Sequence, residues 1–145
     1  MNATQIRDIR IYRAVSKISR PIADATHAIS DIAFYVLELT TEGGVTGQGY
    51  LLSFHYSPAA IEGALRDVCR FLQTHPYQVY ETLQFQKEYE NESEYFGVVG
   101  LQRWALATVN VAMWDAWART LGQPISRLFG CHTGRIPVYG SGGWL

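Results

Sequence analysis

Cysteine is scarce in this sequence, and neither sign of charge is in excess. Cys69 and Cys131 are the only cysteines in 145 residues, and they form no C-x-x-C motif. Two isolated cysteines do not make a disulfide framework, so we expect reduced thiols and a cytoplasmic protein. The formal net charge of -1 provides no electrostatic footprint for nucleic acid or an anionic membrane surface. The N-terminus is polar and basic, without the apolar segment of a secretory signal.

Familiar catalytic and metal-binding motifs are also missing. The four histidines are widely spread and have no H-E-x-x-H or other metal-ligand spacing. The glycine-rich run Gly43–Gly49 lacks the Lys-Ser/Thr ending of a phosphate loop, and Ser141 does not lie in a G-x-S-x-G elbow. Asp115 has Arg119 four residues later on the same helical face, which favours a structural ion pair. The sequence therefore predicts no self-sufficient catalytic set.

The segment Leu101–Leu121 contains neither proline nor glycine. Apolar residues recur at helical spacing on one face, and the opposite face is also largely apolar, which predicts a helix buried on most sides. Polar side chains interrupt the segment too often for a membrane span, which favours a buried helix instead. Gly122 suits the residue that ends such a helix, and a short further turn is expected over Ile125–Phe129.

The first third of the chain reads as strands. Ile6–Val15 alternates between two faces, and Asp31–Thr40 is rich in strand-forming residues. Thr41–Gly44 predicts a tight turn, so that Val45–Leu51 pairs back in an antiparallel sense. Ser16–Ser30 contains a proline and shows no usable period, which predicts a long irregular loop.

Two further helices are expected between these strands and the long apolar helix. Ser57 as N-cap and Pro58 at the first turn begin one that runs to about Thr74, and the other covers Val79–Glu90. Gly47 and Gly49 in the third strand favour close backbone packing over a ligand site. The predicted fold class is α+β, a three-stranded antiparallel meander followed by a helical bundle.

One motif in the second half resembles a known family. The residues from Ala105 to Gly130 read A-x-x-x-V-x-x-A-x-W-D-A-x-A-R-x-L-G-Q-P-I-x-R-L-F-G, and R-I-P-V-Y-G-S-G-G follows. This pattern resembles the enolase superfamily, and more narrowly its mandelate racemase/muconate lactonizing enzyme branch. The resemblance implies an N-terminal capping domain over residues 1–130 and, over residues 131–145, the first strand of a (β/α) barrel whose remainder is absent.

The resemblance also implies a division of labour between the two domains. In similar enzymes the barrel supplies three carboxylate ligands for Mg²⁺ and the acid/base residues, and the metal stabilises the enediolate formed by proton abstraction α to a carboxylate. Those catalytic and metal-binding residues are not expected in this chain. The polar capping loop favours a small carboxylate substrate, a hydroxy acid or sugar acid, and hence a racemase or acid-sugar dehydratase.

Five substrate-binding residues follow from the same resemblance. Ile22, Asp24 and Thr26 lie in the segment that matches the family's capping loop. Tyr56 matches a substrate-contacting tyrosine after the third strand, and Ser141 matches a carboxylate-binding serine at the end of the first barrel strand. The alternative is that these segments are ordinary mobile loops without a ligand role.

The resemblance further implies a homo-oligomer, and the near-neutral charge leads us to expect no nucleic acid and no membrane among the partners. The strand expected at Ile136–Tyr139 begins in the last ten residues and has no partner strand left in the chain. We therefore expect a fragment without turnover of its own, or one subunit of a split enzyme. A stand-alone binding or interaction module that reuses the capping fold is the remaining alternative.

Overall fold

Three antiparallel strands begin the chain in the computed structural model, which describes residues 2–54, 57–131 and 134–140. β1 spans Ile6–Ala23, β2 spans Ala28–Thr41 and β3 spans Thr46–Ser53. The sheet order is β1-β2-β3, so β2 is the central strand and β3 has a free edge. Gly44 in the turn before β3 has φ of 81°, a conformation that glycine adopts without steric cost. The predicted meander is confirmed.

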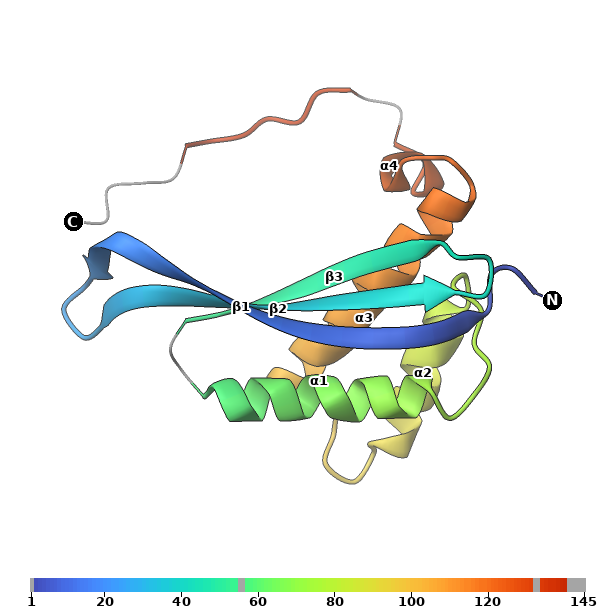
Figure 1. Ribbon diagram of the computed structural model, residues 1–145, viewed down its shortest axis with the longest axis horizontal. Helices are drawn as coiled ribbons and strands as arrows, with labels where there is room; N and C mark the ends of the chain where they lie inside the picture. The colour runs from blue at the N-terminus through green and yellow to red at the C-terminus, as the bar shows by residue number, and fades with distance from the viewer. Residues whose placement is uncertain (1, 55–56, 132–133, 141–145) are drawn as a thin grey trace.

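Helices cover one face of this sheet (Figure 1). α1 spans Pro58–Leu72, α2 spans Thr82–Glu92, α3 spans Leu101–Thr120 and the short α4 spans Ile125–Leu128. α3 packs on β3 and β2, α1 packs on α3, and α2 contacts both helices. This arrangement confirms the predicted α+β fold class.

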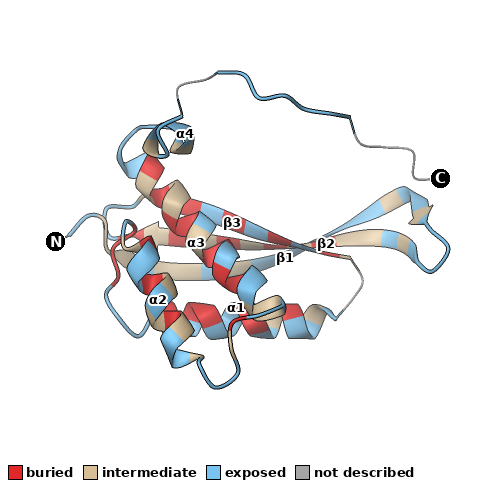
Figure 2. Ribbon diagram, turned by 180° about the vertical axis from the view of Figure 1, so that it is seen from behind, coloured by how far each residue is buried: buried red, intermediate tan, exposed pale blue. Residues whose placement is uncertain are grey.

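The core lies between the sheet and the helices. Alternate residues of β2 are buried because they face the helices, while the intervening residues face away; the buried set is Ala33, Tyr35, Leu37, Leu39 and Thr41. One stripe of α1 and one of α3 complete the core, as Figure 2 shows by the buried residues along both helices. Each large apolar side chain buried here contributes about 1.5–3 kcal/mol to folding.

Two glycines set how closely α3 approaches β3. A Cβ atom placed on Gly47 would lie 2.2 Å from the carbonyl oxygen of Ala112, and one placed on Gly49 would lie 2.2 Å from that of Thr108. Any larger residue would push the helix off the strand. The expectation that these glycines mark close backbone packing is confirmed.

The predicted loop over Ser16–Ser30 is wrong. β1 continues to Ala23 and β2 begins at Ala28, so that the two strands form a ribbon that projects past the rest of the sheet (Figures 1 and 2). Most of its residues are exposed on both faces, so no apolar alternation marks the strands in the sequence. A shift of register between Lys17 and Ile22 accommodates Pro21, which has no N–H to donate to the ladder.

The helix predicted from Val79 begins three residues later, at Thr82. Val79 is fully buried in a turn, and its N–H donates to the carbonyl of Thr4 at 3.0 Å. Gln78, the residue before Val79, forms an isolated antiparallel β-bridge with Gln5. Backbone hydrogen bonds to the N-terminal segment therefore keep Gln78 and Val79 out of the helix. A helical pattern in the local sequence does not reveal this pairing.

The expectation that α3 is buried on most sides is also wrong within the described residues. The face that packs on β3 and α1 is buried, but Trp104 is 56% exposed and Val111 is 51% exposed. The uncovered stripe is as apolar as the buried one, so composition alone cannot separate them. Among the described residues, no helix has the length and apolar character needed to cross a membrane.

Candidate functional site

The β1–β2 ribbon, which carries three of the predicted substrate-binding residues, lies at the same end of the sheet as the end of β3 and the start of α1. Ser53, the last residue of β3, pairs with Ala33 at the base of the β1–β2 ribbon. The chain returns to the sheet at the start of α1, where the Tyr35 hydroxyl donates to the carbonyl of Pro58 at 2.9 Å. The ribbon, the end of β3 and the start of α1 therefore lie at the same end of the domain.

Asp24 organises the tip of the ribbon. Its Oδ1 accepts hydrogen bonds from the backbone N–H groups of Thr26 and His27, both at 2.7 Å, and from the Thr26 hydroxyl at 3.0 Å. The Asp24 N–H in turn donates to the carbonyl of His27 at 2.9 Å and closes the turn. A carboxylate that gathers successive N–H groups in this way is a strong local turn signal. Asp24 and Thr26 are thus brought together at the tip of the ribbon.

The same contacts set the protonation of Asp24. The backbone hydrogen bond from Thr26 is the largest of several that favour the charged form, and they lower the pKa of Asp24 to about 2. The second oxygen, Oδ2, lies 3.4 Å from Nδ1 of His27. At neutral pH the tip therefore presents an exposed carboxylate beside a hydroxyl, a pair suited to a hydroxylated ligand.

The other predicted site residues divide into two groups. Ile22 pairs with Ile29 across the ribbon and is half-buried, so it lies below the tip and apart from Asp24 and Thr26. Tyr56 and Ser141 lie outside the described residues.

Ser57, the residue after Tyr56, was expected to cap α1. Ser57 occupies the N-cap position of α1 as predicted, but its side chain makes no capping hydrogen bond within the described residues. Its φ of 41° is left-handed, which is uncommon for a residue other than glycine. Its carbonyl accepts from the N–H groups of Ala60 and Ile61, so the first turn of α1 is held through the backbone.

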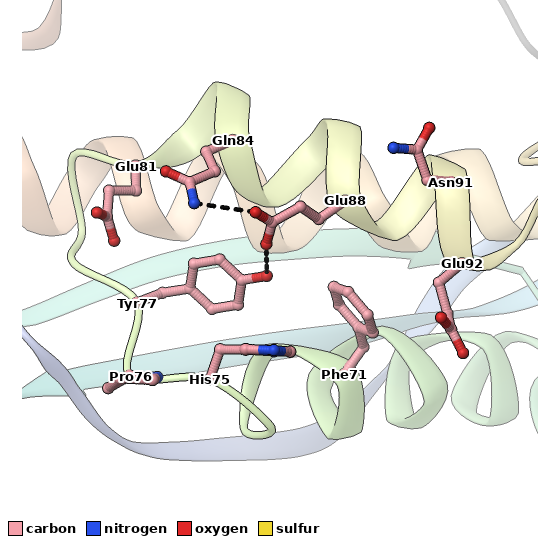
Figure 3. Close-up of a pocket in the computed structure, with 9 residues that line it drawn as sticks. All are labelled: Phe71, His75, Pro76, Tyr77, Glu81, Gln84, Glu88, Asn91 and Glu92. Atoms are coloured by element: carbon pink, nitrogen blue, oxygen red, sulfur yellow. Dashed lines mark hydrogen bonds between the residues drawn. The ribbon is translucent and has the colours of Figure 1, made fainter.

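A cavity of about 560 Å³ that sequence reasoning missed lies between the end of α1 and α2 (Figure 3). The Tyr77 hydroxyl points across it and donates to the Glu88 carboxylate, which also accepts from Gln84 Nε2 at 2.9 Å. The hydrogen bond from Tyr77 lowers the pKa of Glu88, and burial raises the pKa of Tyr77. Tyr77 and Glu88 satisfy each other, so we interpret this pair as a tie between α2 and the α1–α2 connection.

The described residues contain no group of three or more His, Cys, Asp or Glu side chains that could hold a metal ion. Asp115, the carboxylate on α3, accepts from Arg119 Nε at 2.9 Å and from the Gln48 N–H at 2.9 Å. The predicted structural role of Asp115 is confirmed, and the bond to Gln48 was not foreseen because nothing in the sequence places β3 beside this turn of α3.

Comparison with known proteins identifies relatives of the whole domain. The family model described as mandelate racemase/muconate lactonizing enzyme, N-terminal domain, matches residues 6–130. The chain is 33% identical over 118 residues to D-mannonate dehydratase CC0532 of Caulobacter vibrioides, a match that covers 74% of this chain and 26% of that protein. The chain therefore spans about a quarter of the length of this relative.

Solved structures share the fold. The L-talarate/galactarate dehydratase of Salmonella typhimurium LT2 superposes with a TM-score of 0.78 at 18% identity, covering 89% of this chain and 34% of that one. An enolase from Bradyrhizobium, solved with magnesium and mandelic acid, superposes with a TM-score of 0.73 at 25% identity, covering 90% and 36%. The similarity to the Salmonella protein shows the fold alone, and both solved relatives are much longer than this chain.

Proposed function

Because the chain belongs to the mandelate racemase/muconate lactonizing enzyme family of the enolase superfamily, we propose that it is the capping and specificity domain of an acid-sugar dehydratase or racemase. Residues 1–130 form the cap in this proposal, and residues 131–145 begin the barrel. The observation that carries the proposal is the ribbon, which holds Asp24 and Thr26 exposed at its tip, at the end of the sheet where β3 also ends.

In this proposal the chain's own residues bind, orient and enclose a sugar acid. The charged Asp24 carboxylate accepts a hydrogen bond from a substrate hydroxyl group through Oδ2. The Thr26 hydroxyl, which donates to Asp24 Oδ1, accepts a second one through its oxygen, and Ile22 supplies an apolar contact below them. The long ribbon closes over the substrate and excludes water, which strengthens electrostatic interactions within the site. Tyr56 and Ser141 are proposed as further substrate contacts.

The proposed function uses Mg²⁺, but the described residues do not form a site for it. Mg²⁺ takes oxygen ligands, usually carboxylates, and the described part of the chain brings no such set together. When bound, the ion would stabilise the negative charge that develops as the proton α to the carboxylate is removed. Its ligands and the acid/base residues are proposed to lie on the barrel.

A chimera tests the specificity role of the ribbon tip. Residues 1–130 would be joined to the part of the Caulobacter D-mannonate dehydratase that lies beyond the match, and formation of the α-keto acid would be measured with Mg²⁺ on mannonate, galactarate and glucarate. Asp24→Asn keeps the shape and removes the charge, and Thr26→Val removes the hydroxyl. We expect each to change the ratio of kcat/KM between two of these acids by about tenfold.

Lys17→Ala is the matched control, because Lys17 is exposed on the ribbon but lies away from its tip. It should leave the kcat/KM ratios unchanged. Ratios that stay the same in Asp24→Asn and Thr26→Val as well, in a chimera that turns over, would contradict the proposed role of the tip.

A further inference from the structure

His27 belongs to the same turn as Asp24 and Thr26. Its side chain is 52% exposed, and the Asp24 side chain beside it is 51% exposed. Nδ1 of the His27 ring lies 2.6 Å from the Thr26 hydroxyl oxygen and 3.3 Å from Oδ1 of Asp24. The ring nitrogen, the hydroxyl and the carboxylate therefore form one connected cluster at the exposed end of the ribbon.

The hydrogen in each of these contacts follows from the chemistry of the groups. Asp24 is negatively charged at neutral pH, because hydrogen bonds, chiefly the backbone bond from Thr26, lower its pKa to about 2. An ionised carboxylate only accepts hydrogen bonds, so the Thr26 hydroxyl, 3.0 Å from Oδ1, donates its single hydrogen to Asp24. The hydrogen in the 2.6 Å contact between Thr26 and His27 must then come from Nδ1 of the ring.

The opposite assignment leaves two close contacts without a hydrogen. If Nδ1 of His27 had a lone pair, the Thr26 hydroxyl would have to donate to it. The hydroxyl oxygen would then face Oδ1 of Asp24 at 3.0 Å, and Nδ1 would face the same oxygen at 3.3 Å, with lone pairs on both sides. Acceptors at these distances repel each other. The first assignment is the one in which every close contact contains a hydrogen.

We propose that His27 is a positioning residue of the ribbon tip. Its Nδ1–H donates to the Thr26 hydroxyl oxygen, and this bond keeps the Thr26 hydrogen directed at Asp24. Donation runs from His27 to Thr26 to Asp24, with the charged carboxylate at the end of the chain of hydrogen bonds. Thr26 then offers a ligand only a lone pair of its oxygen.

The consequence for specificity rests on the proposed function, in which the tip faces a sugar acid. Oδ2 of Asp24 and the hydroxyl oxygen of Thr26 are both hydrogen-bond acceptors in this arrangement. They match a substrate hydroxyl group, which donates. They do not match a second carboxylate, which only accepts and has the same charge as Asp24. The tip therefore selects a hydroxyl group, and favours an aldonic acid over the aldaric acid of the same configuration.

The position of the ring proton is measurable on the 145-residue chain, whatever the chain caps. At about pH 8.5, where imidazole rings are neutral, long-range ¹H–¹⁵N correlation distinguishes a protonated ring nitrogen from one with a lone pair. We expect Nδ1 of His27 to be the protonated nitrogen. Thr26→Val removes the oxygen that accepts from Nδ1, and should move part of the population to the form with the proton on Nε2. A wild-type ring with its proton on Nε2 would overturn the proposal.

Two variants of His27 separate the hydrogen bond from the shape of the side chain. Asparagine and leucine branch in the same way, but only asparagine can place an N–H where Nδ1 stands in histidine. His27→Asn should therefore hold the Thr26 hydroxyl as histidine does, and His27→Leu should release it. Both variants keep the backbone N–H of residue 27 that donates to Oδ1 of Asp24 at 2.7 Å, and the amide shifts of the turn report that it is intact.

The specificity readout uses the chimera of residues 1–130 with the Caulobacter dehydratase. Mannonate and mannarate are the substrate pair, because they share one configuration and differ only in the hydroxyl or carboxylate at C6. At about pH 8.5, His27→Leu should lower the ratio of kcat/KM, mannonate over mannarate, about fivefold relative to the wild-type cap. His27→Asn should keep the ratio within about twofold, and Lys17→Ala should leave it unchanged.

The two measurements fail in different ways. A chimera that turns over neither acid would count against the capping role, and the position of the ring proton then decides the role of His27 by itself. In an active chimera, equal ratios in His27→Asn and His27→Leu, or a higher ratio in His27→Leu, would overturn the specificity assigned to the tip.

Discussion

The Asp115 carboxylate on α3 accepts a hydrogen bond from the backbone N–H of Gln48 on β3 at 2.9 Å. The bond joins residues that are far apart in the sequence and closes an otherwise open position on the strand edge. Arg119, one helical turn further along α3, donates to the same oxygen at 2.9 Å and keeps the carboxylate in place. The helix and the sheet are therefore fixed in register as well as packed together.

Replacing Asp115 should weaken this connection. Asp115→Ala leaves the Gln48 N–H without its partner, and we expect a loss of about 1–2 kcal/mol in the free energy of unfolding, measured by urea denaturation. Arg119→Ala removes only an exposed ion pair and should cost less than about 0.5 kcal/mol. Equal losses in the two variants would show that the bond to Gln48 contributes nothing of its own.

The contact between β3 and α3 gives a sharper stability prediction. Gly49→Ala places a methyl group 2.2 Å from the carbonyl oxygen of Thr108, so the helix must move away from the strand. We expect a loss of about 3 kcal/mol or more, or no cooperative unfolding transition. Gly63→Ala is the control, because a Cβ there meets nothing within 4 Å. It should stabilise α1 by about 0.5–1 kcal/mol.

Protonation of Asp24 at low pH should weaken the hydrogen bonds that hold the ribbon tip. Hydrogen bonds, chiefly the backbone bond from Thr26, lower the pKa of Asp24 to about 2 in the folded chain, below its ordinary value of 3.8. Asp24 has a lower pKa in the folded chain than in the unfolded chain. Its contribution to the free energy of unfolding is therefore complete above its ordinary pKa and is lost as the pH falls through about 2. In an NMR titration the Thr26 and His27 amides should shift with the Asp24 carboxyl. A midpoint near the ordinary value would contradict the turn.

Protonation of Glu88 at low pH should also reduce the stability of the folded chain. The hydrogen bond from Tyr77 is the main cause of the lowered pKa of Glu88, so Tyr77→Phe should raise that pKa toward its ordinary value. Because the folded-state pKa is the lowered one, the stability from this pair is lost as the pH falls. The drop in stability from neutral pH to acid, measured by urea denaturation, should therefore shrink in Glu88→Gln. An unchanged drop would mean that Glu88 is not coupled to folding.

Local patterns predicted the centre of the sheet, the turn before β3 and the end of α3. The turn before β3 and the glycine after α3 both have left-handed backbone, with φ of 81° at Gly44 and 61° at Gly122. The ribbon beyond Val15 was not predictable, because residues exposed on both faces leave no alternation. The buried turn at Val79 depends on the hydrogen bond from its N–H to the distant Thr4. Non-local contacts of this kind carry no signal in the local sequence.

The candidate site could be anticipated only in part. Asp24 and Thr26 meet through a turn that lies within a few residues, so their proximity follows from local chemistry. The exposed stripe at Trp104 and Val111 could not be foreseen, because its residue types match those of the buried face. The substrate-binding roles of all five predicted residues remain predictions.

The most direct test of the capping role is turnover by the chain alone. The purified 145-residue protein would be incubated with Mg²⁺ and a panel of mannonate, galactarate, glucarate and mandelate, and α-keto acid formation and loss of optical activity would be followed. We predict rates equal to those of buffer with Mg²⁺. Dehydration or racemisation by this chain, abolished by Asp24→Asn but not by Lys17→Ala, would contradict the assignment of the chemistry to a separate barrel.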